Sequence, residues 1–453
     1  MMNRKGWAVL ALVLSISAPA VHAQPLSDAL ASAYNTSGLL DQNRALLRAA
    51  DEDVAQAVAT TLPVINWSLN ATRRDTFGDF ETTTNTTTAR ISASLTLYDG
   101  GANRLAIASQ KEIVLATRQS LRRVEQDVLL RAVQAYTGLR SAQEFVQLRQ
   151  NNTRVITQEF RAAQDRFEVG EVTRTDVALA EARLAAARSL LASAQGDLAR
   201  AAEEYRVAVG VVATNPRDVS PAPVSRSLAE AKALAVRNHP SILEAQHNVA
   251  AIELTIRRAE AAVIPRVTLD GFVSTDQDSN QTAQLGVSVG GPIYAGGSIP
   301  SQVRQLQANR DSARSGLLLT QQQIQQQVAN AFALLQVARA TREASDQQIS
   351  AARVAFEGVR EEATLGSRTT LDVLNAEQEL LDAEANRIAA QSDEVVASYS
   401  LLAAMGLLTA DHLNLPVQQY DPSEYYNLVK NAPPAISAQG RALDRILEAI
   451  GEN

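Results

Sequence analysis

The chain has no cysteine among its 453 residues. Disulfides, cysteine-ligated metal sites and a thiol for a lipid anchor are therefore excluded. Long hydrophobic runs are also missing, because the one extended apolar stretch is shorter than the ~20 residues of a membrane-spanning helix. Aromatic residues make up only 4% of the chain, and the formal net charge of −7 is mild. This charge argues against nucleic acid as a partner.

The N-terminus has the three parts of a secretory signal peptide. Arg4 and Lys5 precede an apolar run over Trp7–Ile16, and small residues then lead to Ala23. This pattern predicts cleavage after Ala23, so residues 1–23 are expected to be a signal peptide. An N-terminal membrane anchor is the alternative, but the apolar run is short for one. An exported chain without cysteine fits a bacterial envelope better than a disulfide-forming secretory pathway.

Two stretches of the chain are near-copies, "VGEVTRTDV" at Val169–Val177 and "LGSRTTLDV" at Leu365–Val373. The segment "YDGG" at Tyr98–Gly101 recurs as "YAGG" at Tyr294–Gly297, at the same separation along the chain as the first pair. The chain is therefore expected to be internally duplicated. The predicted boundaries are a first repeat over 24–214, a linker over 215–226, a second repeat over 227–410 and a tail over 411–453.

Each repeat has the same predicted order of elements: an opening helix of about 36 residues, a β-hairpin, a very long helix, a tip and a last helix. The predicted ranges in the two repeats are 26–61 and 228–263 for the opening helices, and 63–98 and 265–294 for the hairpins. They are 103–168 and 299–364 for the long helices, and 169–177 and 365–373 for the tips. Apolar residues in the long helices recur at spacings of three and four, which is the coiled-coil pattern. The repeats differ in length inside the hairpins, where a variable loop is expected.

The predicted hairpins have the alternation of membrane strands. Apolar residues alternate with Asn, Ser, Thr and other residues over 65–72, 89–97, 267–274 and 285–289, and the length suits a tilted transmembrane strand. Four strands cannot close a barrel, and a bilayer does not tolerate an open sheet edge. A cyclic trimer with twelve strands is the simplest closure. Ordinary surface hairpins on a soluble protein are the alternative.

An aromatic residue and a pair of glycines end each predicted hairpin. The tyrosine suits a membrane–water interface, and the glycines would let the chain turn from sheet into helix. The predicted junction residues are Tyr98, Gly100, Gly101, Tyr294, Gly296 and Gly297.

The duplicated "LP…Y-x-G-G…V-G-x-x-T" series, with "VLNAEQELLDAE" after the second tip, resembles the TolC family of bacterial outer-membrane export ducts. The resemblance covers the mature chain to about Leu415. It implies a mostly α fold with a small β part, a homotrimer whose 12-stranded barrel in the outer membrane continues into a periplasmic helical tunnel. It also implies two partners, a periplasmic adaptor and an inner-membrane transporter of the ABC or RND type.

The same resemblance places both tips at the periplasmic entrance of the duct. It matches Arg368 to a residue that holds the entrance shut, and it matches Thr175 and Asp176 to the partners of that residue. It further implies that Asp372 forms a constricting acidic ring. The second acidic ring of the family falls on Asn375, and a tyrosine that supports closure falls on Ala363, so this chain departs from the family at both places. The tip residues expected to dock the adaptor are Val169, Gly170, Glu171, Leu365 and Gly366.

Helix capping is a second explanation for the threonine and aspartate in both tips. Thr175 or Thr369 could cap the helix that follows, with an aspartate in its first turn. Capping does not account for the additional charges at Glu171 and Arg368.

The sequence gives no sign of an enzyme, a cofactor or a metal site. His239 and His247 are too far apart for a metal-binding pair one helical turn apart, and no glycine-rich phosphate loop follows a strand. The "YDP…YYN…KNAP" tail is similar to family members that serve type I protein secretion, and drug efflux is the other export function considered. A periplasmic coiled-coil adaptor or structural stalk without a membrane barrel is the alternative to an export duct.

Overall fold

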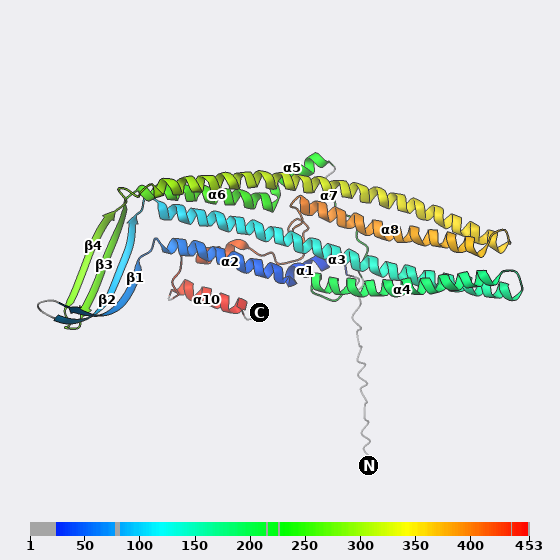
Figure 1. Ribbon diagram of the computed structural model, residues 1–453, viewed down its shortest axis with the longest axis horizontal. Helices are drawn as coiled ribbons and strands as arrows, with labels where there is room; N and C mark the ends of the chain where they lie inside the picture. The colour runs from blue at the N-terminus through cyan, green and yellow to red at the C-terminus, as the bar shows by residue number, and fades with distance from the viewer. Residues whose placement is uncertain (1–23, 78–81, 214–215, 225–226, 436, 452–453) are drawn as a thin grey trace, which may run out of the picture.

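The computed structural model describes residues 24–77, 82–213, 216–224, 227–435 and 437–451. The predicted signal peptide, residues 1–23, lies outside this part of the chain. The molecule is long and narrow, with strands at one end and two helix-to-helix turns at the other (Figure 1). Two helices of 67 residues, α3 (Ala102–Glu168) and α7 (Ser298–Thr364), run between the ends. At about 1.5 Å per residue each is roughly 100 Å long.

Both halves of the chain have the same order of elements, which confirms the internal duplication. The first half consists of α1 (Leu26–Thr36), α2 (Gly38–Ala59), β1 (Val64–Thr76), β2 (Thr82–Tyr98), α3 and α4 (Arg174–Val209). The second half consists of α5 (Leu228–Asn238), α6 (Pro240–Glu260), the short turn η1 (Ala261–Val263), β3 (Arg266–Asp276), β4 (Gln281–Gly290), α7 and α8 (Thr370–Ala404). The helices α9 (Pro422–Val429) and α10 (Ala438–Gly451) follow in the tail.

The opening helix of each half is broken into two, so the expectation of a single helix of about 36 residues was wrong. In the first half Ser37 adopts an extended conformation, and its side chain accepts a hydrogen bond from the Leu40 N–H. In the second half His239 takes this place and accepts from the Ser241 N–H. Pro240 follows it, and proline disfavours helical backbone in the preceding residue. Each break is therefore a new helix start with its own cap.

The four strands form one antiparallel sheet in the order β1-β2-β3-β4, so the hairpins of the two halves pair through β2 and β3. Residues that face each other across the strands share a side of the sheet. Trp67, Ile91 and Val273 lie in one such row, and their side chains are 80%, 60% and 57% exposed. On the other side, the Arg90 guanidinium lies 4.0 Å from the centroid of the Phe272 ring. The predicted apolar and polar faces are thus confirmed.

The strands extend further than the sequence pattern indicated. β1 reaches Thr76 and β2 begins at Thr82, inside a polar stretch that was expected to be a loop. The two strands have 13 and 17 residues, whereas β3 and β4 have 11 and 10. Longer strands therefore account for the extra length of the first hairpin. Threonine is abundant in this stretch, and its branched side chain favours extended backbone.

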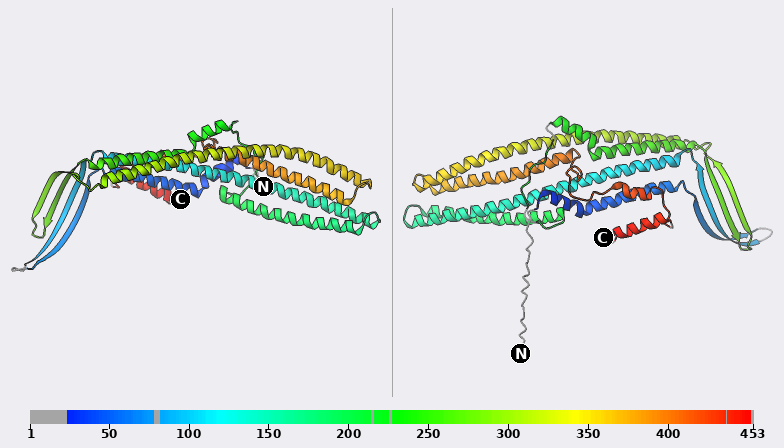
Figure 2. Two further views of the ribbon diagram at one scale, coloured as in Figure 1. Left: turned by 45° about the horizontal axis from the view of Figure 1, so that its top comes forward. Right: turned by 180° about the vertical axis from the view of Figure 1, so that it is seen from behind.

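The helical part consists of two hairpins that lie side by side. Figure 2 shows α4 along α3 and α8 along α7, with the two turns at the same end of the molecule. The largest apolar cluster lies in the middle of the molecule, where the ends of α4 and α8 meet α1, α5 and the long helices. Tyr136 and Leu139 of α3 and Leu335 of α7 are almost fully buried in it. This cluster fixes the two halves relative to each other.

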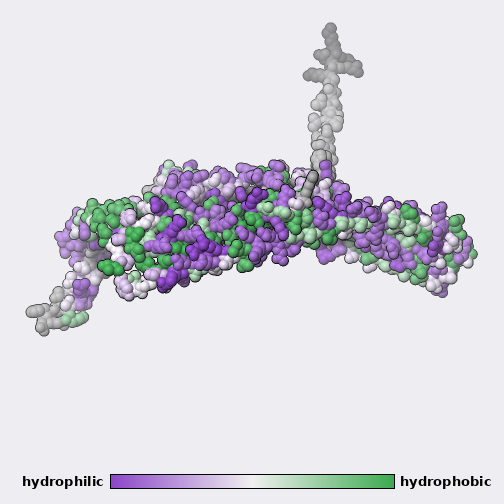
Figure 3. Space-filling model, turned by 90° about the horizontal axis from the view of Figure 1, so that it is seen from above, coloured by the Kyte–Doolittle hydropathy of each residue, from purple (hydrophilic) through white to green (hydrophobic). Residues whose placement is uncertain are grey.

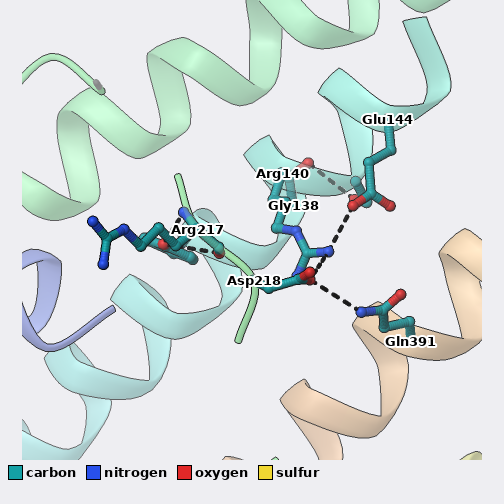
Figure 4. A network of polar contacts seen from close by, with 8 residues as sticks. Gly138, Arg140, Glu144, Arg217, Asp218 and Gln391 are labelled. Carbon is teal, nitrogen blue, oxygen red and sulfur yellow. Dashed lines mark hydrogen bonds and ion pairs between the residues drawn. The ribbon is translucent and has the colours of Figure 1, made fainter. Parts of the chain in front are cut away.

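Between the two halves, residues 216–224 cross the middle of the molecule as a strap without helix. The Arg217 N–H donates to the Tyr136 hydroxyl over 2.8 Å. The next residue, Asp218, forms an ion pair with Arg140 and accepts a hydrogen bond from Gln391 (Figure 4). Because Arg140 lies on α3 and Gln391 on α8, the strap links the two repeats at this level.

The described part of the chain contains no helix that is long and apolar enough to cross a membrane. Figure 3 shows hydrophobic side chains exposed at the sheet end and in patches along the mainly polar helical body.

Candidate functional site

The two tips are built alike, starting with the way each long helix ends. Gly170 follows α3 and Gly366 follows α7, and their φ angles of 82° and 79° lie in the left-handed region that glycine adopts without strain. One residue further on, the Glu171 N–H donates to the Arg166 carbonyl over 2.9 Å. The Ser367 N–H donates in the same way to the Glu362 carbonyl, over 3.0 Å. Both helices thus end in the same glycine-dependent cap.

The helices that leave the tips begin with matching capping boxes. Thr173 and Asp176 exchange side-chain and backbone hydrogen bonds at the start of α4, and Thr369 and Asp372 do so at the start of α8. Capping by Thr369 is therefore confirmed, whereas capping by Thr175 was wrong. The hydrogen bonds from Thr173 lower the pKa of Asp176, and those from Thr369 lower the pKa of Asp372. Both carboxylates are ionised at neutral pH.

Within one chain, Arg368 does not meet the partners that the resemblance implied. Its Nε donates to Glu362, in the last turn of α7, over 2.8 Å. Thr175 is exposed, and no side-chain hydrogen bond joins it to another described residue. The tips nevertheless line one open hollow of about 1000 Å³, which both Asp176 and Arg368 border. The Arg368 link therefore stays a prediction for the assembled protein.

Three polar contacts among the described residues join the two repeats near the tips. Arg360 of α7 lies 3.8 Å from Glu159 of α3. The Asn375 side chain on α8 accepts a hydrogen bond of 3.4 Å from Arg183 of α4. Two residues further along α8, Glu377 accepts a hydrogen bond of 2.8 Å from Asn152 of α3.

Of these residues, the sequence interpretation had singled out only Asn375, for a different role. The others were missed because a contact between helices far apart in the sequence has no local signal. The heptad pattern does reveal that Glu377 belongs to the buried stripe of α8, three residues after Leu374 and four before Leu381.

The outermost residues of the tips are exposed and partly apolar. The Val169 and Leu365 side chains are 72% and 80% exposed. Each comes directly before the glycine that ends its helix. Glu171 is exposed in the first tip, and Ala363 lines the hollow between the tips.

At the other end of the long helices, the predicted junction residues lie where the sheet meets the helices. Tyr98 and Tyr294 are 55% and 88% exposed. The φ angles of all four glycines are positive, from 60° to 85°. Those glycines are Gly100, Gly101, Gly296 and Gly297. A left-handed glycine therefore starts each long helix.

The described residues contain no cluster of histidine, cysteine, aspartate and glutamate that could hold a metal ion. His239, considered as a metal ligand, is buried and caps α6. His247 lies 2.8 Å from Glu112.

Comparison with known proteins shows which family has this architecture. The profile of the outer membrane efflux protein family matches residues 29–211 and 233–407. The outer membrane efflux protein BepC of Brucella suis is 37% identical over 436 residues, which cover 94% of each chain. The proteases secretion protein PrtF of Dickeya chrysanthemi is 26% identical, over 84% of this chain and 88% of PrtF. The crystal structure of CusC superposes with a TM-score of 0.76 at 19% identity, over 84% of this chain and 91% of CusC.

The fold and these relatives define an outer-membrane channel whose helical part lies in the periplasm. The chain belongs to the outer membrane efflux protein family. Its TolC-like fold is as predicted: mostly helical, with four strands per chain that can close a barrel only in an assembly such as the homotrimer. Members of this family are transport proteins rather than enzymes.

Proposed function

We propose that this chain is the exit duct of an export system, working with a periplasmic adaptor and an inner-membrane transporter of the ABC or RND type. The observation that supports this proposal most is that the two ends of the molecule differ in chemistry and lie far apart. An exposed apolar sheet face suits the outer membrane, and the tips lie roughly 100 Å of helix away, where inner-membrane partners can reach them. Reconstitution into planar bilayers should give discrete pores, and crosslinking should give trimers. A chain that is monomeric and forms no pores would contradict the duct.

The cargo is proposed to be proteins or small molecules. The name of PrtF supports type I protein secretion, and the name of BepC supports efflux. A strain that lacks this chain separates the two. Protein secretion predicts that a specific protein disappears from the medium, and efflux predicts that a dye accumulates in the cells.

The adaptor is proposed to dock on the exposed ends of the tips, at Val169 and Leu365. Apolar side chains exposed beside polar ones are typical of protein-binding surfaces. A photo-crosslinking residue at either position should capture the adaptor. Val212 provides a matched control, because it is 75% exposed but follows α4, far from the tips. Equal capture from Val212 would contradict docking at the tips.

The entrance is proposed to be held shut by Arg368 of one protomer and by Thr175 and Asp176 of a neighbour. Arg368 uses its Nε for Glu362, so its two terminal nitrogens can bind another carboxylate. Asp176 uses one carboxylate oxygen, Oδ2, for its cap, which leaves Oδ1 for an arginine. Asp372 is proposed to add a ring of negative charge, to which Asn375 contributes none.

The conductance of reconstituted trimers tests this lock. Arg368→Ala and Asp176→Ala should both raise single-channel conductance. Asp176→Ala also removes a helix cap, so Thr173→Ala, which weakens the same cap but keeps the carboxylate, is its control. Glu362→Ala is the control for Arg368, because it removes only the bond within the tip. Unchanged conductance in both test variants would count against the lock.

A further inference from the structure

A polar pair interrupts the apolar contact between the two repeats just above the tips. On the tip side, Ile156 of α3 packs with Leu374 of α8 in one buried cluster. On the other side, Leu148 of α3 packs with Leu381 of α8 in a second cluster. On α3, Asn152 lies between Leu148 and Ile156. On α8, Glu377 lies between Leu374 and Leu381. Both therefore occupy positions where a coiled coil normally places apolar residues.

The pair is buried and only partly satisfied. The Asn152 side chain donates from Nδ2 to Glu377 Oε1 over 2.8 Å, and the residues are 9% and 6% exposed. No described residue provides a hydrogen bond to the buried Glu377 Oε2. Asparagine is neutral, so this contact does not compensate the charge of an ionised Glu377. A buried carboxylate without a bonded cation is costly.

Two charged groups face Glu377 from the neighbouring helices. Glu159 on α3 repels a carboxylate there, and Arg183 on α4 attracts it. Arg183 donates its hydrogen bond to Asn375 instead, and Glu159 lies near Arg360. Burial, partly opposed by the hydrogen bond from Asn152, raises the pKa of Glu377 to about 7. The charge state of Glu377 therefore changes close to neutral pH. An exposed glutamate loses its proton at a much lower pH and is fully ionised at neutral pH.

We propose that Asn152 and Glu377 form the release point of the entrance: protonated Glu377 holds α8 against α3, and ionised Glu377 weakens that contact, so that the second hairpin can move outward. This inference rests on the proposed duct with its entrance at the tips. It differs from the Arg368 lock because the contact lies within one chain, in the buried seam between the repeats. A polar pair in a seam also fixes the register of the helices at some cost in stability.

The ionised fraction of a group with a pKa near 7 rises from about a tenth at pH 6 to about nine tenths at pH 8. Full-length trimers in planar bilayers should therefore show a larger conductance at pH 8 than at pH 6. Glu377→Gln keeps the size and the hydrogen bond but cannot ionise, so it should stay at the low conductance across this range. Glu379→Gln changes an exposed glutamate two residues after Glu377. This variant should retain the pH response of the unmodified protein.

A second variant makes the test independent of the first. Asn152→Asp places another carboxylate against Glu377, and it should give a higher conductance than the unmodified protein at pH 8. If the unmodified chain forms no pores, the proposed function fails. If it forms pores and Glu377→Gln keeps the same pH response, or Asn152→Asp leaves the conductance unchanged, the release point is overturned and the duct stands.

Discussion

Two glycines that end helices offer a direct test of how the core is packed. Gly170 ends α3 and Gly210 ends α4, and their φ angles, 82° and 83°, are almost equal. An alanine Cβ at Gly170 would meet no described atom within 4 Å. At Gly210 it would lie 2.7 Å from the Cβ of Thr36, and closer still to the Thr36 hydroxyl. The same substitution therefore has the same backbone strain at both sites but a steric clash at only one.

The expected losses of stability follow from these contacts. Alanine in the left-handed region costs about 1 kcal/mol or somewhat more, so Gly170→Ala should destabilise by about that amount. Gly210→Ala adds the repacking of an overfilled site, typically about 1–3 kcal/mol. Thr36 must also move away from the Val209 carbonyl, to which its hydroxyl donates over 3.1 Å, at a cost of about 1 kcal/mol. The sum for Gly210→Ala is about 3–5 kcal/mol.

Guanidinium unfolding of detergent-solubilised protein, followed by helical circular dichroism, measures both losses. The double variant Gly210→Ala with Thr36→Ala should recover part of the stability, because the clashing hydroxyl is gone. Equal losses for Gly170→Ala and Gly210→Ala, or no recovery in the double variant, would refute the steric argument.

Two further predictions use the same unfolding measurement. Asp99 caps the start of α3 by accepting from two backbone N–H groups, so Asp99→Ala should cost about 1 kcal/mol. Ala295 takes its place in the second repeat, and Ala295→Asp should gain a similar amount; no gain would contradict the cap. Burial lowers the pKa of His239 to about 4. Only the unfolded chain then binds this proton, so stability should fall as the pH drops from about 6.5 towards 4. His239→Asn should flatten that slope and His412→Asn, at an exposed site, should not.

The long helices could be predicted closely because their limits depend on local signals. The expected ranges 103–168 and 299–364 differ by a single residue from α3 and α7. A glycine pair precedes each helix and a glycine follows its last turn, and glycine is the residue that adopts the left-handed backbone found at these places. The heptad pattern then fills the interval between them.

The errors have equally local causes. The split of each opening helix was missed, although Ser37-Gly38 and His239-Pro240 are both start signals. In the first tip, the cap was expected at Thr175, with Asp176 in the first turn. The spacing that makes a capping box is three residues, which selects Thr173, and the second tip has the same spacing from Thr369 to Asp372.

The residues proposed to release the entrance mark the limit of what one sequence can reveal. The spacing in α8 suffices to bury Glu377, and the spacing in α3 suffices to bury Asn152. Neither pattern tells which residue of one helix faces which residue of the other, because 225 positions separate them and each helix could slide by a turn. The central apolar cluster and the strap at Asp218 remove that freedom by fixing the repeats relative to each other. The tip chemistry thus depends on packing in the middle of the molecule, and weakening the strap should disturb the Asn152–Glu377 contact without altering either residue.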